Sequence, residues 1–496
     1  MDGGRILLHV RAPVGMRVEE TAAEFAAVEN TIRQLIPPSE IDTIVDNIGT
    51  YLSSINTIYN NTGTIGESDG DIEISLNPGH APTANYVKLL REQLPRCFPG
   101  ITFSFLPADI VSQILNFGTP APIDVQVRGN DLAADYAYAN RLLPQIRAVD
   151  GAADVRIEQS AAQPTIDVDL DRTHAQYTGV TAADVTDSLV VNLDGSSQVA
   201  PTYWLDTRNG VSYPIALQTP QYKLDTLAAL RNLPINAPGA PTTVLGGIAD
   251  IHRSQSDAVV SQYNIVPMVD IYATTQGRDL GGVSRDIRKI IVQNDHDRPK
   301  GSIVALVGQT VTMNSAYSGL LIGLVGAIVL VYLVIVVNFQ SWSDPFVIIT
   351  ALPAALAGIV WILFVTHTTL SVPALTGAIM CMGVATANSV LVISFAREQL
   401  DELGDATQAA IAAGFVRLRP VLMTALAMII GMLPMALGLG DGGQENAPLG
   451  RAVIGGLMFA TVSTLFFVPV MFSVIHGRNA RKPASQSAPG DNHVPI

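Results

Sequence analysis

Residues 320–337 read LLIGLVGAIVLVYLVIVV and contain no charged side chain. Four more uncharged runs of similar length follow before residue 476. A helix needs ~17–25 apolar residues to cross the hydrocarbon core of a bilayer. The sequence therefore predicts a membrane bundle over residues 315–476, with five transmembrane helices at about 318–337, 345–365, 372–396, 420–440 and 452–475.

Basic residues are placed unevenly around these helices. Three arginines at positions 397, 417 and 419 separate the third and fourth helices, and three basic residues at 478, 481 and 482 follow the fifth. Lys and Arg are enriched in short cytoplasmic loops. We therefore expect a multi-pass protein of the bacterial inner (plasma) membrane with a cytoplasmic C-terminus and a disordered tail at 477–496. Residues 1–315 would then lie in the periplasm.

Composition and the motifs that are missing from the sequence exclude several classes of function. The chain has 496 residues, a formal net charge of −14 and two cysteines, Cys97 and Cys381. The acidic balance argues against a nucleic-acid partner, and we expect no disulfide because Cys381 lies inside a predicted helix. An HExxH motif and a P-loop are both missing from the sequence, so it predicts a non-enzymatic protein with no cofactor or bound metal. No leader precedes the first predicted strand, from which we expect the C-terminal part of a longer protein.

The region before the helices alternates strands and amphipathic helices. Its first part reads β-α-β-β-α-β, the order of the ferredoxin-like (split βαβ) arrangement. A second such set begins at residue 123, is interrupted, and resumes at residue 268. We therefore predict an α+β periplasmic region with a first porter subdomain at 1–118, a second at 119–164 and 268–310, and an inserted docking subdomain at 165–267. A strand hairpin is expected at Asn209-Gly210.

A long polar segment at residues 43–70 carries regularly placed apolar and aromatic side chains. Ile48, Tyr51, Ile55 and Tyr59 are candidates for the lining of a substrate pocket. The alternative is a strand and turn that pack on the domain core. At the end of this segment, residues 67–71 (Glu67-Ser-Asp69-Gly-Asp71) resemble part of a calcium loop, but the distal Glu is missing, which favours a turn.

Polar residues are scarce inside the predicted helices. The runs 421–440 and 452–475 and the third helix before Arg397 contain no ionisable side chain. A proton-driven transporter needs a titratable group at membrane depth, so these helices cannot supply one. Asn388, Ser389 and Thr424 remain as polar candidates, with hydrogen bonding between helices as the alternative role. Small residues four apart, such as Gly456 and Ala460, predict close helix packing.

Four segments of the chain are similar to the resistance–nodulation–division (RND) efflux transporters. They are GVATANSVLVISFAR at 383–397, RLRPVLMTALA at 417–427, NFQSWSDP at 338–345 and FVPV at 467–470. The resemblance covers roughly residues 5–476 and is strongest to the hydrophobe and amphiphile (multidrug) branch. It implies the C-terminal half of a proton-driven pump that exports small hydrophobic or amphiphilic compounds. The implied partners are the pump's N-terminal half, which is missing here, two further copies in a homotrimer, a periplasmic adaptor and an outer-membrane channel.

The resemblance also implies functional roles for individual residues. Asn388, Arg417 and Thr424 match positions that belong to or flank the family's proton relay. Ala387 stands where drug exporters usually have a lysine that pairs with the aspartates of the missing half. The segment 43–70 falls where the family's substrate pocket lies. Two alternatives stay open: an inert fragment or membrane-anchored scaffold, and a lipid- or protein-export member of the superfamily, against which the insertion at 165–267 argues.

Overall fold

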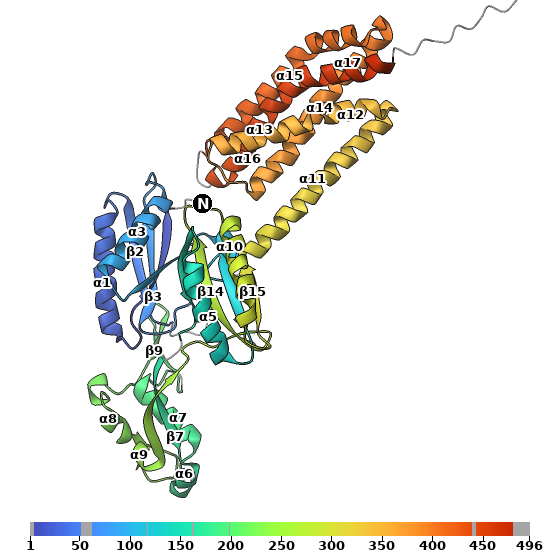
Figure 1. Ribbon diagram of the computed structural model, residues 1–496. Helices are drawn as coiled ribbons and strands as arrows, with labels where there is room; N and C mark the ends of the chain where they lie inside the picture. The colour runs from blue at the N-terminus through green and yellow to red at the C-terminus, as the bar shows by residue number, and fades with distance from the viewer. Residues whose placement is uncertain are drawn as a thin grey trace, which may run out of the picture.

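Long apolar helices form the C-terminal part of the computed structural model (Figure 1). The structure describes residues 4–50, 62–116, 118–160, 163–197, 199–438 and 443–479. Within them, five helical segments are long and apolar enough to cross a membrane. They are α11 (Gln309–Phe339), α12 with α13 (Ser343–Ile349 and Leu352–Val365), α14 (Val372–Leu403), α15 (Ala406–Ala436), and α16 (Gly443–Val462) continued by a π-helical turn (Ser463–Phe467) and α17 (Val468–Asn479).

The structure corrects the expected loop between the third and fourth helices. Arg397 lies on α14, and Arg417 and Arg419 lie on α15, so none of the three is in a loop. The connection is reduced to Gly404 and Asp405. Gly404 takes a left-handed conformation with a φ of 69°, and the Asp405 side chain accepts a hydrogen bond from the backbone N–H of Thr407. Because a glycine C-cap and an aspartate N-cap need no further residues, both helices extend beyond their uncharged runs.

Small residues bring the helices into contact. A Cβ atom added to Gly358 of α13 would lie 2.4 Å from the backbone oxygen of Gly455 on α16. A Cβ added to Gly456 would lie 2.5 Å from Cys381 Sγ on α14. Gly456 is one of the small residues expected at a packing position, and the structure places it in this contact. Without a hydrophobic driving force between helices in lipid, such close backbone approach is what holds a bundle together.

The first α/β body spans residues 5–106 and contains a four-stranded sheet in the order β2-β3-β1-β4. Alternate residues of β1, such as Leu8 and Val10, point to a core that helices α1 and α3 cover. The opposite face of the sheet carries polar side chains. The elements are β1 (Arg5–Arg11), α1 (Val18–Leu35), β2 (Ile41–Ile48), β3 (Asp69–Leu76), α3 (Thr83–Cys97) and β4 (Thr102–Leu106).

The second α/β body follows the short helix α4 (Ile110–Leu115) and is made from two separate stretches of chain. Its central strands β5 and β14 pair antiparallel, with Val269 opposite Val127. Helices α5 and α10 cover the apolar face. The elements are β5 (Ile123–Arg128), α5 (Leu132–Arg147), β6 (Ala152–Ile157), β13 (Ser261–Tyr263), β14 (Val266–Thr275), α10 (Leu280–Gln293) and β15 (Ile303–Gly308), from which the chain enters α11.

A third body is inserted between β6 and β13 and lies at the end of the α/β region that is farthest from the long helices (Figure 1). Its strands β7 and β12 form a two-stranded ribbon beside a small apolar core. A separate hairpin of β8 and β9 turns at Asn209-Gly210, as the sequence predicts. The elements include β7 (Gln163–Leu170), α6 (Arg172–Thr178), α7 (Ala182–Leu193), β8 (Thr202–Asp206), β9 (Val211–Ile215), α8 (Leu227–Arg231), α9 (Leu245–Ile248) and β12 (Ala249–Ser256).

A bidentate ion pair joins the first and second bodies where the edge strands β4 and β6 meet. Arg91 of α3 donates from Nε and Nη2 to the two carboxylate oxygens of Asp154, at 2.8 and 2.6 Å. Arg91 Nη1 also donates to Gln276 Oε1 at 2.5 Å. Asp154 in turn accepts from the backbone N–H of Phe105. A bidentate guanidinium–carboxylate pair fixes orientation as well as distance, so this contact sets how the two sheets meet.

Candidate functional site

The polar face of the first sheet holds a buried histidine between two aspartates. His9 of β1 is directly opposite Asp71 of β3 in the strand register, and Arg11 is opposite Asp69. The Nδ1 atom of His9 lies 2.8 Å from Asp71 Oδ1, and its Nε2 atom lies 3.6 Å from Asp69 Oδ2. His9 is 1% exposed and Asp69 is fully buried. The turn expected over residues 67–71 covers only Glu67 and Ser68, whereas Asp69 and Asp71 belong to strand β3.

These contacts set the charges of the cluster. Burial alone would lower the pKa of His9, but hydrogen bonding to Asp69 and Asp71 outweighs burial and raises the pKa above its ordinary value. Burial would raise the pKa of Asp69, but His9, Arg11 and the backbone N–H of Gly66 hold it below its ordinary value. The protonated imidazole of His9 is therefore more favoured in this cluster than it would be in a free histidine.

Arg11 connects this cluster to the second body. Its Nε atom donates to Asp69 Oδ2 at 3.3 Å, and its Nη1 atom donates to the backbone oxygen of Glu158 at 3.1 Å. The Nη2 atom donates to the backbone oxygen of Gly63 at 3.3 Å. Glu158 comes directly after β6, so the polar faces of the two sheets meet at this arginine.

The polar face of the second sheet carries a pair of buried carboxylates. Asp124 of β5 and Asp270 of β14 are 0% and 1% exposed and sit on adjacent strands. Gln126 Nε2 donates to Asp124 Oδ2 at 2.7 Å, and Gln159 Nε2 donates to Asp270 Oδ2 at 2.5 Å. The Oδ1 atom of each aspartate has no hydrogen-bond partner among the described residues.

Burial dominates the titration of this pair. It raises the pKa of Asp124 to about 8, and the negative charge of Asp270 adds to the effect. Burial also raises the pKa of Asp270 to about 6; the hydrogen bond from Gln159 lowers this pKa, and the charge of Glu158 raises it by a smaller amount. Two carboxylates in one low-dielectric site resist carrying two negative charges, so the pair retains a proton near neutral pH.

The two clusters lie on the helix-free faces of the two sheets, which Arg11 connects. Carboxylate oxygens and imidazole nitrogens are the ligands that divalent cations use in proteins. Among the described residues, however, no group of three or more such side chains converges on one point as a preformed metal centre. As they stand, Asp124 and Asp270 can hold a proton, and the pairing of His9 with Asp71 would have to open for His9 to become a ligand.

The membrane candidates lie together on α14 and α15. Thr424 Oγ1 is 3.3 Å from Asn388 Oδ1, so it can donate to the amide across the two helices, and the neighbouring Ser389 pairs with Thr464 at 3.0 Å. Arg417 lies on the same side of α15, with its guanidinium carbon 5.1 Å from the centre of the Phe395 ring. Asn388 is buried whereas Thr424 is exposed. The predicted residues therefore share one polar face, whose role in proton transfer stays a prediction.

Of the four residues predicted to line a substrate pocket, the structure describes only Ile48. Ile48 ends strand β2, is partly buried, and packs against the core of the first body. This is the alternative considered for it from the sequence. Tyr51, Ile55 and Tyr59 lie outside the described residues. Their role in a substrate pocket stays a prediction.

A further ion cluster was not predicted. Asp344 at the start of α12 is 2% exposed and lies 3.3 Å from Arg397 Nη1 on α14 and 3.0 Å from His476 Nε2 on α17. Arg397 also donates to the backbone oxygen of Phe339 at 2.7 Å. Asp344 is the one carboxylate between the first two predicted helices, and that signal could have drawn attention to it. These contacts join α11, α12, α14 and α17 at one end of the bundle.

Comparison with known proteins gives a consistent picture. The sequence profile of the AcrB/AcrD/AcrF family matches residues 1–476. The chain is 27% identical to the cobalt-zinc-cadmium resistance protein CzcA of Cupriavidus metallidurans over 503 aligned positions, which cover 98% of this chain and 46% of CzcA. It is 28% identical to the cation efflux system protein CusA of Escherichia coli over 383 positions, covering 74% of this chain and 36% of CusA.

A solved structure has a similar fold. A crystal structure of a heavy metal efflux pump superposes with a TM-score of 0.79 at 24% identity and covers 96% of this chain and 48% of that chain. At this identity the likeness concerns the fold alone. The chain thus spans about half the length of the curated relatives it matches.

Proposed function

Since the chain belongs to the AcrB/AcrD/AcrF family of resistance–nodulation–division transporters, we propose that it is part of an inner-membrane efflux pump that exports metal cations in exchange for protons. The observation that carries the choice of substrate is the pair of buried carboxylates Asp124 and Asp270, each with an unpartnered oxygen. The names of CzcA and CusA refer to metal resistance and cation efflux, which supports the same choice. The comparisons do not support hydrophobic or amphiphilic compounds, the substrate class that the sequence favoured.

The proposed architecture follows the family. The helices α11 to α17 would form five transmembrane spans, with the α/β bodies in the periplasm and the C-terminus in the cytoplasm. The first and second bodies would be ferredoxin-like porter subdomains at 1–118 and at 119–164 with 268–310, and the insertion at 165–267 would be the docking subdomain. Assembly as a trimer with an adaptor and an outer-membrane channel is part of the proposal, as is a relay role for Asn388, Arg417 and Thr424.

At the carboxylate pair, binding of a cation should be coupled to release of a proton. A cation that enters between Asp124 and Asp270 replaces the retained proton, because the positive charge favours the ionised form of both groups. Cation affinity should therefore rise with pH up to about 8, the pKa of Asp124. The same logic predicts proton release when Zn²⁺ or Co²⁺ is added at pH 7.

Equilibrium dialysis of the purified chain tests the proposal, with Zn²⁺ and Co²⁺ in one arm and the amphiphilic cation ethidium in the other. We expect Zn²⁺ binding that weakens at least tenfold in the double variant Asp124→Asn with Asp270→Asn. The matched control is Glu73→Gln, which neutralises an exposed carboxylate on the polar face of the first sheet. Ethidium binding without metal binding would favour the drug-exporter alternative, and binding of neither would favour an inert scaffold.

A further inference from the structure

Asp154 of β6 takes a left-handed backbone conformation with a φ of 51°. It lies at a bulge in the pairing of β6 with β14. Arg156 of β6 is opposite Tyr272 of β14, whereas Ala153 is opposite Thr274, so β6 has one extra residue between these pairs. Bulges that require a left-handed residue usually have glycine there, because a Cβ atom disfavours this conformation. Asp154 therefore adopts, at a cost in free energy, a conformation that suits glycine.

The contacts that offset this cost come from the first body and not from the strand itself. Both carboxylate oxygens of Asp154 accept hydrogen bonds from Arg91, and Oδ2 also accepts from the backbone N–H of Phe105 at 3.0 Å. Phe105 lies on β4 at the edge of the first sheet. The side chain of Asp154 is only 4% exposed. Because charge-assisted hydrogen bonds are strong in such a buried place, the neighbouring body stabilises the left-handed form.

A bulge of this kind has a second backbone form. In that form its first residue lies near the right-handed helical region, which residues other than glycine adopt without strain. The change rotates the backbone of Asp154 and turns its carboxylate away from Arg91. Arg91 keeps a partner within its own body, because its guanidinium carbon lies 5.0 Å from the centre of the Phe105 ring. Both members of the ion pair therefore have a stable arrangement when they are apart.

We propose that Arg91 and Asp154 form a latch between the first and second bodies. While the ion pair is made, it holds the bulge in the left-handed form; when the bodies separate, the bulge relaxes. The relaxed strand no longer presents its carboxylate to Arg91, so the junction stays open until the bulge is forced back. Backbone strain that is held in place by surrounding contacts is typical of switch regions. The proposal does not depend on the exported substrate or on the membrane orientation.

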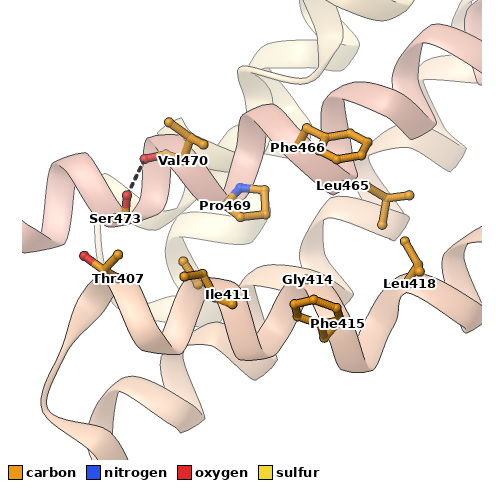
Figure 2. Close-up of a pocket in the computed structure, with 11 residues that line it drawn as sticks. Thr407, Ile411, Gly414, Phe415, Leu418, Leu465, Phe466, Pro469, Val470 and Ser473 are labelled. Atoms are coloured by element: carbon orange, nitrogen blue, oxygen red, sulfur yellow. Dashed lines mark hydrogen bonds between the residues drawn. The ribbon is translucent and has the colours of Figure 1, made fainter.

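The latch borders a cavity of about 880 Å³ between the two bodies. Arg91 and Gln276 line this cavity together with Asn116, whose buried side-chain amide has no hydrogen-bond partner among the described residues. The lining differs from that of the hollow between α15 and α17, which consists almost entirely of apolar side chains (Figure 2). Because the cavity lies between the bodies, the state of the bulge determines how far it is open.

Hydrogen exchange of the amides of β6 and β14, measured by mass spectrometry on the purified chain, tests the latch. Arg91→Gln, Asp154→Ala and Asp154→Gly all remove the ion pair, but only glycine keeps the left-handed form without strain. We expect exchange at the bulge, corrected for the intrinsic rate of each sequence, to be about tenfold faster than in the wild-type chain for Arg91→Gln and Asp154→Ala. Asp154→Gly should stay close to the wild-type rate. The matched control is Arg96→Gln, an exposed arginine of the same helix.

The order of the two Asp154 variants separates the latch from an ordinary ion pair. Glycine normally weakens a strand, so slower exchange in Asp154→Gly than in Asp154→Ala requires that the left-handed form matters. Equal exchange in these two variants would overturn the proposal. A wild-type rate at the bulge in Arg91→Gln would also overturn it, because the ion pair would then not hold the bulge.

Spin labels report whether the bulge is coupled to the separation of the bodies. One label is placed on the native Cys97, which is exposed at the end of α3, and one on Arg288→Cys, an exposed position of α10, with Cys381→Ala to prevent a third label. We expect a second, longer distance in Arg91→Gln and in Asp154→Ala. Faster exchange at the bulge with an unchanged distance distribution would refute the coupling.

Discussion

The buried pair of Asp124 and Asp270 makes a quantitative prediction about pH. The pKa of Asp124 is raised to about 8 by burial and by the neighbouring charge, whereas an unfolded chain releases the same proton near pH ~3.9. Between pH 5 and pH 8 Asp124 therefore holds a proton in the folded second body that it lacks in the unfolded body. The contribution of Asp124 to the free energy of unfolding should fall by ~1.4 kcal/mol per pH unit, or about 4 kcal/mol over this range.

The variant Asp124→Asn isolates this contribution, because asparagine is neutral at every pH and has nearly the same size. Hydrogen exchange of the amides of β5 and β14, followed by mass spectrometry, provides the readout. Dividing the wild-type rate by the variant rate at each pH cancels the intrinsic pH dependence of exchange. For amides that exchange only when the whole body unfolds, about 4 kcal/mol corresponds to a rise of roughly a thousandfold in this ratio from pH 5 to pH 8.

A second carboxylate controls for the general effect of removing a charge. Asp150→Asn neutralises an exposed residue in the turn before β6 of the same body, and its ratio should stay constant with pH. The reasoning would be refuted by a constant ratio for Asp124→Asn. An equal rise for Asp150→Asn would also refute it, since the effect would then not come from the buried pair.

Three further predictions concern other contacts. Gly358→Ala should destabilise the helical bundle by ~1–3 kcal/mol through overpacking against Gly455, while Gly431→Ala should not, as thermal melting of the purified chain in detergent can show. Arg91→Gln should weaken the junction of the first two bodies by about 2 kcal/mol and broaden the distance between spin labels on the two bodies. His9→Gln should remove a stabilisation of the first body that is complete below pH ~6.5 and is lost as pH rises through the elevated pKa of His9, which the pH dependence of exchange in β1 measures.

Much of the secondary structure was accessible from the sequence. The first body has the predicted order β-α-β-β-α-β, because alternation of period two and apolar spacing of 3.6 are local signals. The five long apolar helices were likewise predicted from uncharged runs. The ends of α14 and α15 were not predicted, since residues 397–419 carry charges that suggested a loop, whereas in the structure the chain leaves the helical conformation only around Gly404.

The two clusters of buried charged residues could not be predicted from local sequence patterns. His9 and Asp71 are 62 residues apart, and only the antiparallel register of β1 and β3 places them opposite each other. Asp124 and Asp270 are separated by the whole inserted body and meet through the pairing of β5 with β14. The sequence instead predicted a substrate pocket at Tyr51, Ile55 and Tyr59, because the regular spacing of apolar and aromatic residues is visible there. The residues that such a pocket would bring together from distant parts of the chain are not visible in the sequence.

The amino-acid sequence by itself determined the division between long apolar helices and an α/β region, because hydrophobicity and its period act within a few turns of chain. It also determined the family, through motifs such as GVATANSVLVISFAR at 383–397. Only the tertiary structure decided which charges are buried together and therefore which of them hold protons. A pKa depends on the dielectric and on charges within a few ångströms, and those neighbours come from distant parts of the chain.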